Sequence, residues 1–110
     1  MAEAVDVLPG TLEFLVLKAL TWGPRHGYAI ASWLRATTGE ALSIEEGALY
    51  PALHRLERRG LVKGRWGRSE NNHRVKDYTL TDAGRQELVR QLATWSRYVG
   101  LVGRIIRATT

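Results

Sequence analysis

The segment Ser43–Val62, which reads SIEEGALYPALHRLERRGLV, constrains the fold more than any other part of this chain. At about 100° per residue, Leu49, Leu53 and Leu56 fall on one arc of a helix, which is the arc expected to pack on a core. The opposite arc carries small, polar and cationic residues, namely Gly47, Tyr50, Pro51, His54, Arg55 and Arg58. Such a helix is expected to cover a domain with its basic side outward.

The start of this helix has its own signals. Ser43 and Glu46 have the spacing of a capping box, in which each side chain satisfies a backbone donor of the other residue. This pattern predicts a helix over residues 43–59. Pro51 disturbs it, because proline has no backbone donor and its ring presses on the carbonyl of Gly47. Either the helix kinks at Pro51 or its regular part begins close to Tyr50.

Two runs of period two follow the helix, Leu61–Trp66 and Val75–Leu80, and they predict an antiparallel hairpin. Residues 67–74 between them are rich in Gly, Ser and Asn and predict its loop. Two amphipathic helices are expected earlier, over about residues 12–22 and 27–38. Three helices followed by a hairpin predict a mainly α fold with a small β-hairpin, the winged helix-turn-helix.

A last helix is expected from Thr81 or Asp82 onward. Its apolar residues are spaced 4, 3, 4, 3 and 4 apart, at Leu88, Leu92, Trp95, Val99, Val102 and Ile106. This a/d pattern predicts a dimerisation helix, with packing on the first helix of the same chain as the alternative. The chain therefore divides into an N-terminal tail (1–8), a winged domain (9–80) and a C-terminal dimerisation helix (81–110).

The positive charge is concentrated in one segment. Residues 54–76 hold eight Lys or Arg against two Glu, which is +6, and the net charge of +5 leaves −1 for the rest of the chain. This distribution is typical of a protein that docks on a polyanion. The helix is suited to a DNA major groove, and the hairpin loop to a minor groove or the phosphates beside it. An acidic protein partner is the alternative.

The candidate DNA contacts are the polar and cationic residues of the helix and hairpin: Ser43, Tyr50, Pro51, His54, Arg55, Arg58, Lys63, Arg65, Arg68, Asn71, Asn72, His73, Arg74 and Lys76. For Asn71 and Asn72, turn geometry alone is the more economical interpretation. His26 is expected to be a structural or capping residue. Trp95 is either a core residue or a stacking platform for a small aromatic effector.

Other function classes are disfavoured. The chain has no cysteine, its three histidines are scattered, and no nucleophile stands beside a recognisable base, so no enzyme, metal site or cofactor is expected. No apolar run approaches the roughly 18 residues that a membrane span needs, so no membrane partner is expected. Met1–Leu8 lacks a basic region typical of a signal peptide, and a cytoplasmic location is expected.

These motifs together resemble the PadR family of transcriptional regulators, in its short form and close to the acidobacterial subgroup. The resemblance is carried by His26–Ile30, by Gly47–Glu57 with its LYPALHRLE run, and by Tyr78–Thr81. It implies a bacterial repressor that binds a palindromic operator as a homodimer and, in some members, is released by a small aromatic compound. It also implies DNA-facing positions at Tyr50, Pro51, His54, Arg55, Asn71, Asn72 and Arg74. The chain departs from the family at Ala48, where a hydroxyl residue is common, and at Asp77, where an aromatic residue is usual.

Overall fold

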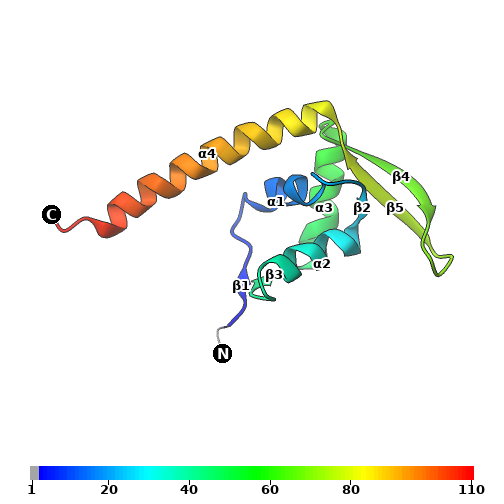
Figure 1. The fold of residues 1–110 in the computed structure, drawn as a ribbon, viewed down its shortest axis with the longest axis horizontal. Helices are drawn as coiled ribbons and strands as arrows, with labels where there is room; N and C mark the ends of the chain where they lie inside the picture. Colours follow the sequence, from blue (N-terminus) through cyan, green and yellow to red (C-terminus); the bar gives the residue numbers. More distant parts are fainter. Residues whose placement is uncertain (1–2) are drawn as a thin grey trace.

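In the computed structural model, three short helices pack around one apolar core, and a hairpin and a long helix extend from it in different directions (Figure 1). The structure describes residues 3–110. In chain order the elements are β1 (Val5–Asp6), α1 (Leu12–Ala19), β2 (Arg25–His26), α2 (Gly27–Thr37), β3 (Leu42–Ser43), α3 (Glu46–Arg58), β4 (Val62–Arg68), β5 (Arg74–Leu80) and α4 (Asp82–Arg107). This arrangement is the mainly α winged helix-turn-helix that the sequence predicts, with a C-terminal helix added.

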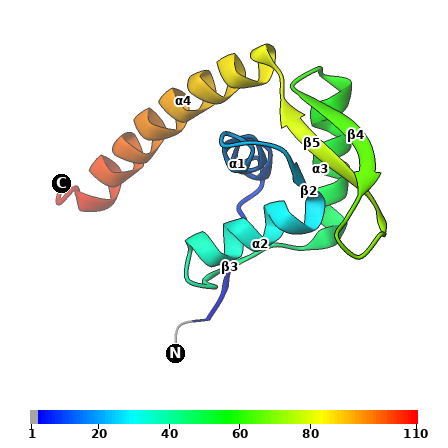
Figure 2. The ribbon, with the colours of Figure 1, turned by 45° about the vertical axis from the view of Figure 1, so that its right-hand side comes forward.

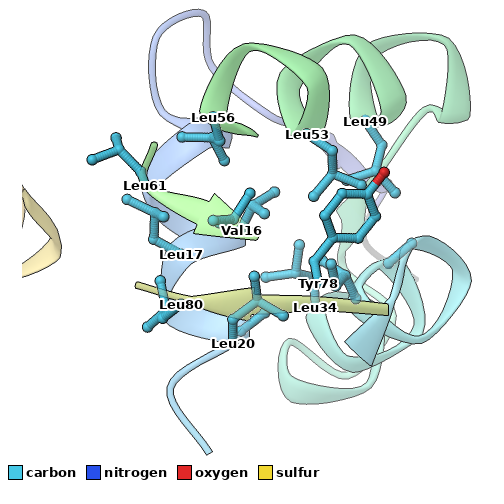
Figure 3. Packing of buried hydrophobic residues seen from close by; sticks show 14 of the residues in the cluster. Val16, Leu17, Leu20, Leu34, Leu49, Leu53, Leu56, Leu61, Tyr78 and Leu80 are labelled. Carbon is cyan, nitrogen blue, oxygen red and sulfur yellow. The ribbon is translucent and has the colours of Figure 1, made fainter. Parts of the chain in front are cut away.

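The core lies where α1, α2 and α3 meet the base of the hairpin. Leu49, Leu53 and Leu56 are fully buried, which confirms the apolar arc expected for α3. They meet Val16 and Leu17 of α1, and Figure 3 shows the leucines of both helices gathered around Val16. Burial of each such side chain contributes about 1.5–3 kcal/mol to the stability of the fold, so this cluster fixes the position of α3 on the core.

The hairpin is longer than the sequence indicates. β4 and β5 pair antiparallel from Val62 opposite Leu80 to Arg68 opposite Arg74, so the connecting turn is residues 69–73 and not 67–74. The turn closes on itself, because Ser69 N–H donates to the His73 carbonyl at 2.8 Å and Asn72 adopts a φ of +59°. This turn lets the ladder continue two residues further along β4. The outer half of the hairpin projects beyond the core (Figure 2).

Two short pairings escape sequence reasoning. β2 adds to the hairpin, with Arg25 opposite Tyr78 and His26 opposite Asp77. β1 pairs parallel with β3, so part of the segment 1–8 is joined to the domain through Val5 and Asp6. Strands of two residues give almost no periodicity, which is why neither pairing is visible in the sequence.

The capping box predicted at Ser43 is wrong. Ser43 lies in β3 opposite Asp6, and α3 begins three residues later, with Glu45 as its N-cap and no side-chain capping bond. The strand pairing holds the Ser43 backbone in an extended form, so the residue is too far upstream to cap the helix. The helix also continues through Pro51, so the regular part does not begin near Tyr50.

The long helix α4 begins where the sequence indicates. The Thr81 side chain caps it by accepting from the Gly84 backbone at 3.0 Å. The predicted seam is divided in two. Leu88 is buried in the core and Leu92 packs against it, as the alternative interpretation requires. Val99 and Ile106 lie on the outer half, 48% and 75% exposed.

Candidate nucleic-acid interface

The outward side of α3 carries the residues that the sequence assigned to it. Tyr50, Pro51, His54, Arg55 and Arg58 are all exposed, while the leucines behind them are buried. Burial of these leucines therefore turns the opposite side of α3 toward solvent. Arginine and histidine side chains presented in this way can donate hydrogen bonds to phosphates and to base edges.

The arginines of α3 differ in their partners. Arg55 Nε donates to Glu13 Oε1 of α1 at 2.7 Å. Arg59, just after the helix, bonds the other oxygen of Glu13 at 3.3 Å and lies 3.7 Å from Glu87 of α4. Arg58 has no ion-pair partner within the described chain, so its charge is the most available of the three.

A groove of about 580 Å³ separates α3 from the hairpin. Its walls bring together His54 and Tyr50 from α3, Tyr28 from the start of α2, and Trp66 and Arg74 from the hairpin. Tyr28 and Trp66 are 64% and 55% exposed, and sequence reasoning did not select them as site residues. Trp66 shares a strand face with buried Val62, but it stands on the part of the hairpin that extends beyond the core.

The start of α2 shapes one end of this groove. His26 caps α2, with Nδ1 accepting from the Ala29 backbone at 3.1 Å, which confirms the structural role expected for it. A β-carbon on the next residue, Gly27, would lie 2.7 Å from the Tyr50 ring. Glycine is therefore needed at residue 27 for Tyr50 to sit where it does.

The hairpin supplies a second set of cations. Lys63, Arg65 and Arg68 are exposed along β4. Arg74 lies with its guanidinium 4.3 Å from the centre of the Trp66 ring, a cation–π arrangement that holds the side chain over the strand. Arg68 at the end of β4 donates to the carbonyl of Asn72 in the turn at 3.1 Å, and Asn72 has the left-handed backbone that asparagine tolerates. Asn71 and His73 are exposed beside it.

Lys76 is the exception among the hairpin cations. Its Nζ donates to Glu57 Oε1 of α3 at 2.9 Å, and Glu57 Oε2 accepts from the Gly64 backbone at 3.2 Å. The partner of Glu57 is therefore a lysine of the hairpin. The hydrogen bond from Lys76 lowers the pKa of Glu57, and the same bond raises the pKa of Lys76.

A second hollow, of about 520 Å³, lies between α1 and α4. Its aromatic wall is made by Phe14 and Trp95, whose ring centres are 5.6 Å apart, and by Tyr98 beyond them. Glu13 and Glu87 line the same hollow. Trp95 thus lies against α1 of its own chain and also borders open space.

Within residues 3–110, no group of three or more His, Asp or Glu is arranged to hold a metal ion. No helix in that range is both long enough and apolar enough to cross a bilayer.

Comparison with known proteins places the chain. Residues 16–90 match the model of the transcriptional regulator PadR-like family. The negative transcriptional regulator PadR of Bacillus subtilis is 34% identical over 77 residues, covering 70% of this chain and 42% of that protein. An uncharacterised 37.1 kDa protein from a Streptomyces fradiae transposon is 40% identical over 90 residues, covering 82% of this chain and 24% of that protein. The chain therefore spans less than half the length of these two relatives.

Solved structures agree with the family match. A transcriptional regulator from Clostridium thermocellum superposes with a TM-score of 0.82 at 28% identity, over 89% of this chain and 95% of that one. Bacillus subtilis PadR, solved in complex with operator DNA, superposes with a TM-score of 0.67 at 33% identity, over 74% of this chain and 47% of that one. Regulators of this kind are DNA-binding transcription factors and not enzymes. The chain belongs to the PadR-like family of transcriptional regulators.

Proposed function

We propose that this protein is a sequence-specific repressor that binds a palindromic operator as a homodimer. In this proposal α3 enters the major groove, and the turn of the hairpin reaches the adjacent minor groove or its phosphates. The candidate contacts are those selected from the sequence other than Lys76, which is paired with Glu57, together with Tyr28 and Trp66 of the groove. Bacillus subtilis PadR is a negative transcriptional regulator, and its similarity to this chain supports repression.

One observation carries the proposal. Tyr50 and His54 on the exposed side of α3 border the same groove as Trp66 and Arg74 of the hairpin, so a polyanion can contact both elements at once. Across residues 54–76 the formal charge is +6, whereas the rest of the chain is close to neutral. An acidic protein partner would also be attracted, but the pairing of a helix and a wing across one groove fits the two grooves of a duplex.

Dimerisation would give the DNA-binding protein two-fold symmetry. α4 extends far from the helical core, opposite to the hairpin, and ends in apolar residues that the chain itself leaves exposed (Figure 1). Val99 and Ile106 of the seam are 48% and 75% exposed, so the described chain leaves this end of the apolar seam uncovered. A second copy packed there would place two α3 helices about a two-fold axis, which matches a palindrome.

An effector site is proposed at the hollow between α1 and α4. Trp95, Phe14 and Tyr98 offer ring faces to a small aromatic compound. Because α4 forms one wall of the hollow and α1 the other, an occupant would contact both the winged domain and the helix that is proposed to dimerise. Fluorescence quenching of Trp95 by candidate aromatic compounds measures this binding. The substitution Trp95→Phe gives the signal of the other three tryptophans alone, and the difference from the wild type is the signal of Trp95.

The test of DNA binding is a titration of the full chain with duplexes at several salt concentrations. If α3 and the hairpin bind DNA, log K falls with log salt at a slope of about −0.9 for each phosphate neutralised. A duplex from upstream of the chain's own gene should bind at least about 10³-fold more tightly than a scrambled duplex. Equal and weak binding to every duplex would contradict an operator-specific role and favour the acidic protein partner.

A further inference from the structure

One carboxylate joins the hairpin to α3. Glu57 Oε1 accepts from Lys76 Nζ on β5, and Glu57 Oε2 accepts from the backbone N–H of Gly64 on β4. Three elements therefore meet at a single side chain. We propose that Glu57 is a positioning residue that fixes the angle between the hairpin and α3, and that Lys76 is its counter-charge and not a phosphate contact. This inference rests on the proposed function, because the angle matters only if both elements bind one duplex.

The surroundings of the pair favour this role. The Lys76 and Glu57 side chains are 21% and 32% exposed, so bulk water screens their attraction less than that of a surface pair. Lys76 Nζ also lies 5.4 Å from the Tyr78 ring centre and 5.9 Å from that of Trp66. An ammonium held between a carboxylate and two aromatic rings is poorly placed to leave for a phosphate.

Gly64 shows how closely the pair is fitted. A β-carbon at residue 64 would lie 2.2 Å from Lys76 Cε and 2.8 Å from Glu57 Oε2. The side chains thus occupy the space that any other residue would fill. Gly67, in the same strand, has nothing within 4 Å of its β-carbon position. The two glycines provide a matched pair of variants that alter no charge.

Positioning and direct contact have different consequences for binding. Non-specific binding comes from cations on phosphates, and it tolerates a hairpin held at a changed angle. Operator recognition requires base contacts from α3 while the hairpin is also engaged, so it depends on the angle. Loss of the Glu57 carboxylate should therefore lower the preference for operator over other DNA. Loss of one negative charge should not weaken non-specific binding to DNA.

The experiment compares Glu57→Gln, Lys76→Met, Gly64→Ala and Gly67→Ala in the full chain. Each is titrated with a duplex selected by the wild-type protein from a random pool and with a scrambled duplex, at three or more salt concentrations. We expect Glu57→Gln and Gly64→Ala to bind the selected duplex roughly tenfold less tightly and the scrambled duplex no less tightly. Gly67→Ala should match the wild type. Circular dichroism before titration confirms that each variant is folded.

The salt slope identifies the role of Lys76. If Lys76 is the counter-charge, Lys76→Met keeps the wild-type slope, whereas loss of a phosphate contact would reduce it by about 0.9. A reduced slope would overturn the inference, as would equal losses for both duplexes in Glu57→Gln. If the wild-type protein prefers its selected duplex and Glu57→Gln keeps the same preference, the inference is overturned and the proposed function stands. A wild-type protein that selects no duplex overturns the proposed function as well. If Gly64→Ala is unfolded, Glu57→Gln and Lys76→Met still decide the outcome.

Discussion

Arg55 of α3 donates from Nε to Glu13 Oε1 of α1 at 2.7 Å, so a cation on the exposed side of α3 is already held by a carboxylate. The same carboxylate bonds Arg59 at 3.3 Å. Glu13 therefore binds two positive charges that would otherwise be available to phosphate. An exposed ion pair of this kind is worth about 0.2–1 kcal/mol, which a nearby polyanion can exceed.

Glu13→Gln should tighten DNA binding. The substitution removes the carboxylate that competes for Arg55 and Arg59, and we expect up to about fivefold higher affinity at low salt. Fluorescence anisotropy with a labelled duplex measures this change. Glu40→Gln is the control, because it removes the same charge from an exposed position after α2. Equal tightening in both variants would mean that only net charge matters.

Arg58→Ala should weaken DNA binding without altering stability. Arg58 has no ion pair in the described residues, so its loss removes a cation and breaks no ion pair. We expect a change of less than about 0.5 kcal/mol in the free energy of unfolding. Arg55→Ala should weaken binding and also lower stability slightly, because it breaks the pair with Glu13. Thermal melts beside DNA titrations separate the two effects, and unchanged DNA affinity in both variants would remove α3 from its proposed role.

The elements with strong periodicity are those that the sequence predicts well. The leucines of α3 repeat at helical spacing and are buried as expected, and the hairpin runs alternate as strands do. Ser43 misleads, because its spacing from Glu46 fits a capping box while its backbone pairs with Asp6 from a distant segment. Local patterns contain no information on such a pairing.

In the candidate site, too, features that depend on local periodicity are predicted and those that depend on long-range packing are not. Exposure of His54 and Arg58 follows from the helical period, so the sequence places them on the correct side. The partners of Arg55 and Lys76 do not follow from it, because Glu13 is 42 residues from Arg55 and Glu57 is 19 residues from Lys76. Tyr28 and Trp66 join the groove only through the packing of α2 and the reach of the hairpin beyond the core.

Gly84→Ala should be strongly destabilising. A β-carbon at residue 84 would lie 2.0 Å from the Leu61 carbonyl oxygen, a backbone atom that moves only with the hairpin. Overpacking of this kind costs about 1–3 kcal/mol. Gly100→Ala in the same helix is the control, since nothing lies within 4 Å of its β-carbon position and alanine favours helix by up to about 1 kcal/mol. Urea unfolding should show opposite shifts, and similar shifts in both would contradict the close approach.

Stability should fall in acid because two carboxylates have lowered pKa values. The hydrogen bond from Gln91, helped by one from Arg90, lowers the pKa of Glu87 below its ordinary 4.5. Lys76 lowers the pKa of Glu57 below the same value. A lowered pKa in the folded state gives stability that is present above about pH 4.5 and is lost as the pH falls through the folded value.

Glu87→Gln should flatten this dependence. Melting temperatures of the wild type should change little between about pH 7 and 5 and decline below that, and the variant should decline less. Glu70→Gln is the control, because Glu70 lies in the exposed turn without an ion pair in the described residues. A wild-type decline that both variants share would assign the acid sensitivity to other groups.

Val99→Glu should convert the proposed dimer into a monomer. Val99 is 48% exposed in the single chain and occupies the apolar seam of α4, where a second copy is expected to cover it. A buried, unpaired carboxylate at that contact costs several kcal/mol for each of the two copies. Sedimentation velocity at micromolar concentration measures the change, and circular dichroism shows whether the helices persist. Leu101→Glu is the control, because Leu101 is also exposed on α4 but lies off the seam. A wild-type monomer, or equal dissociation by both substitutions, would contradict dimerisation through this seam.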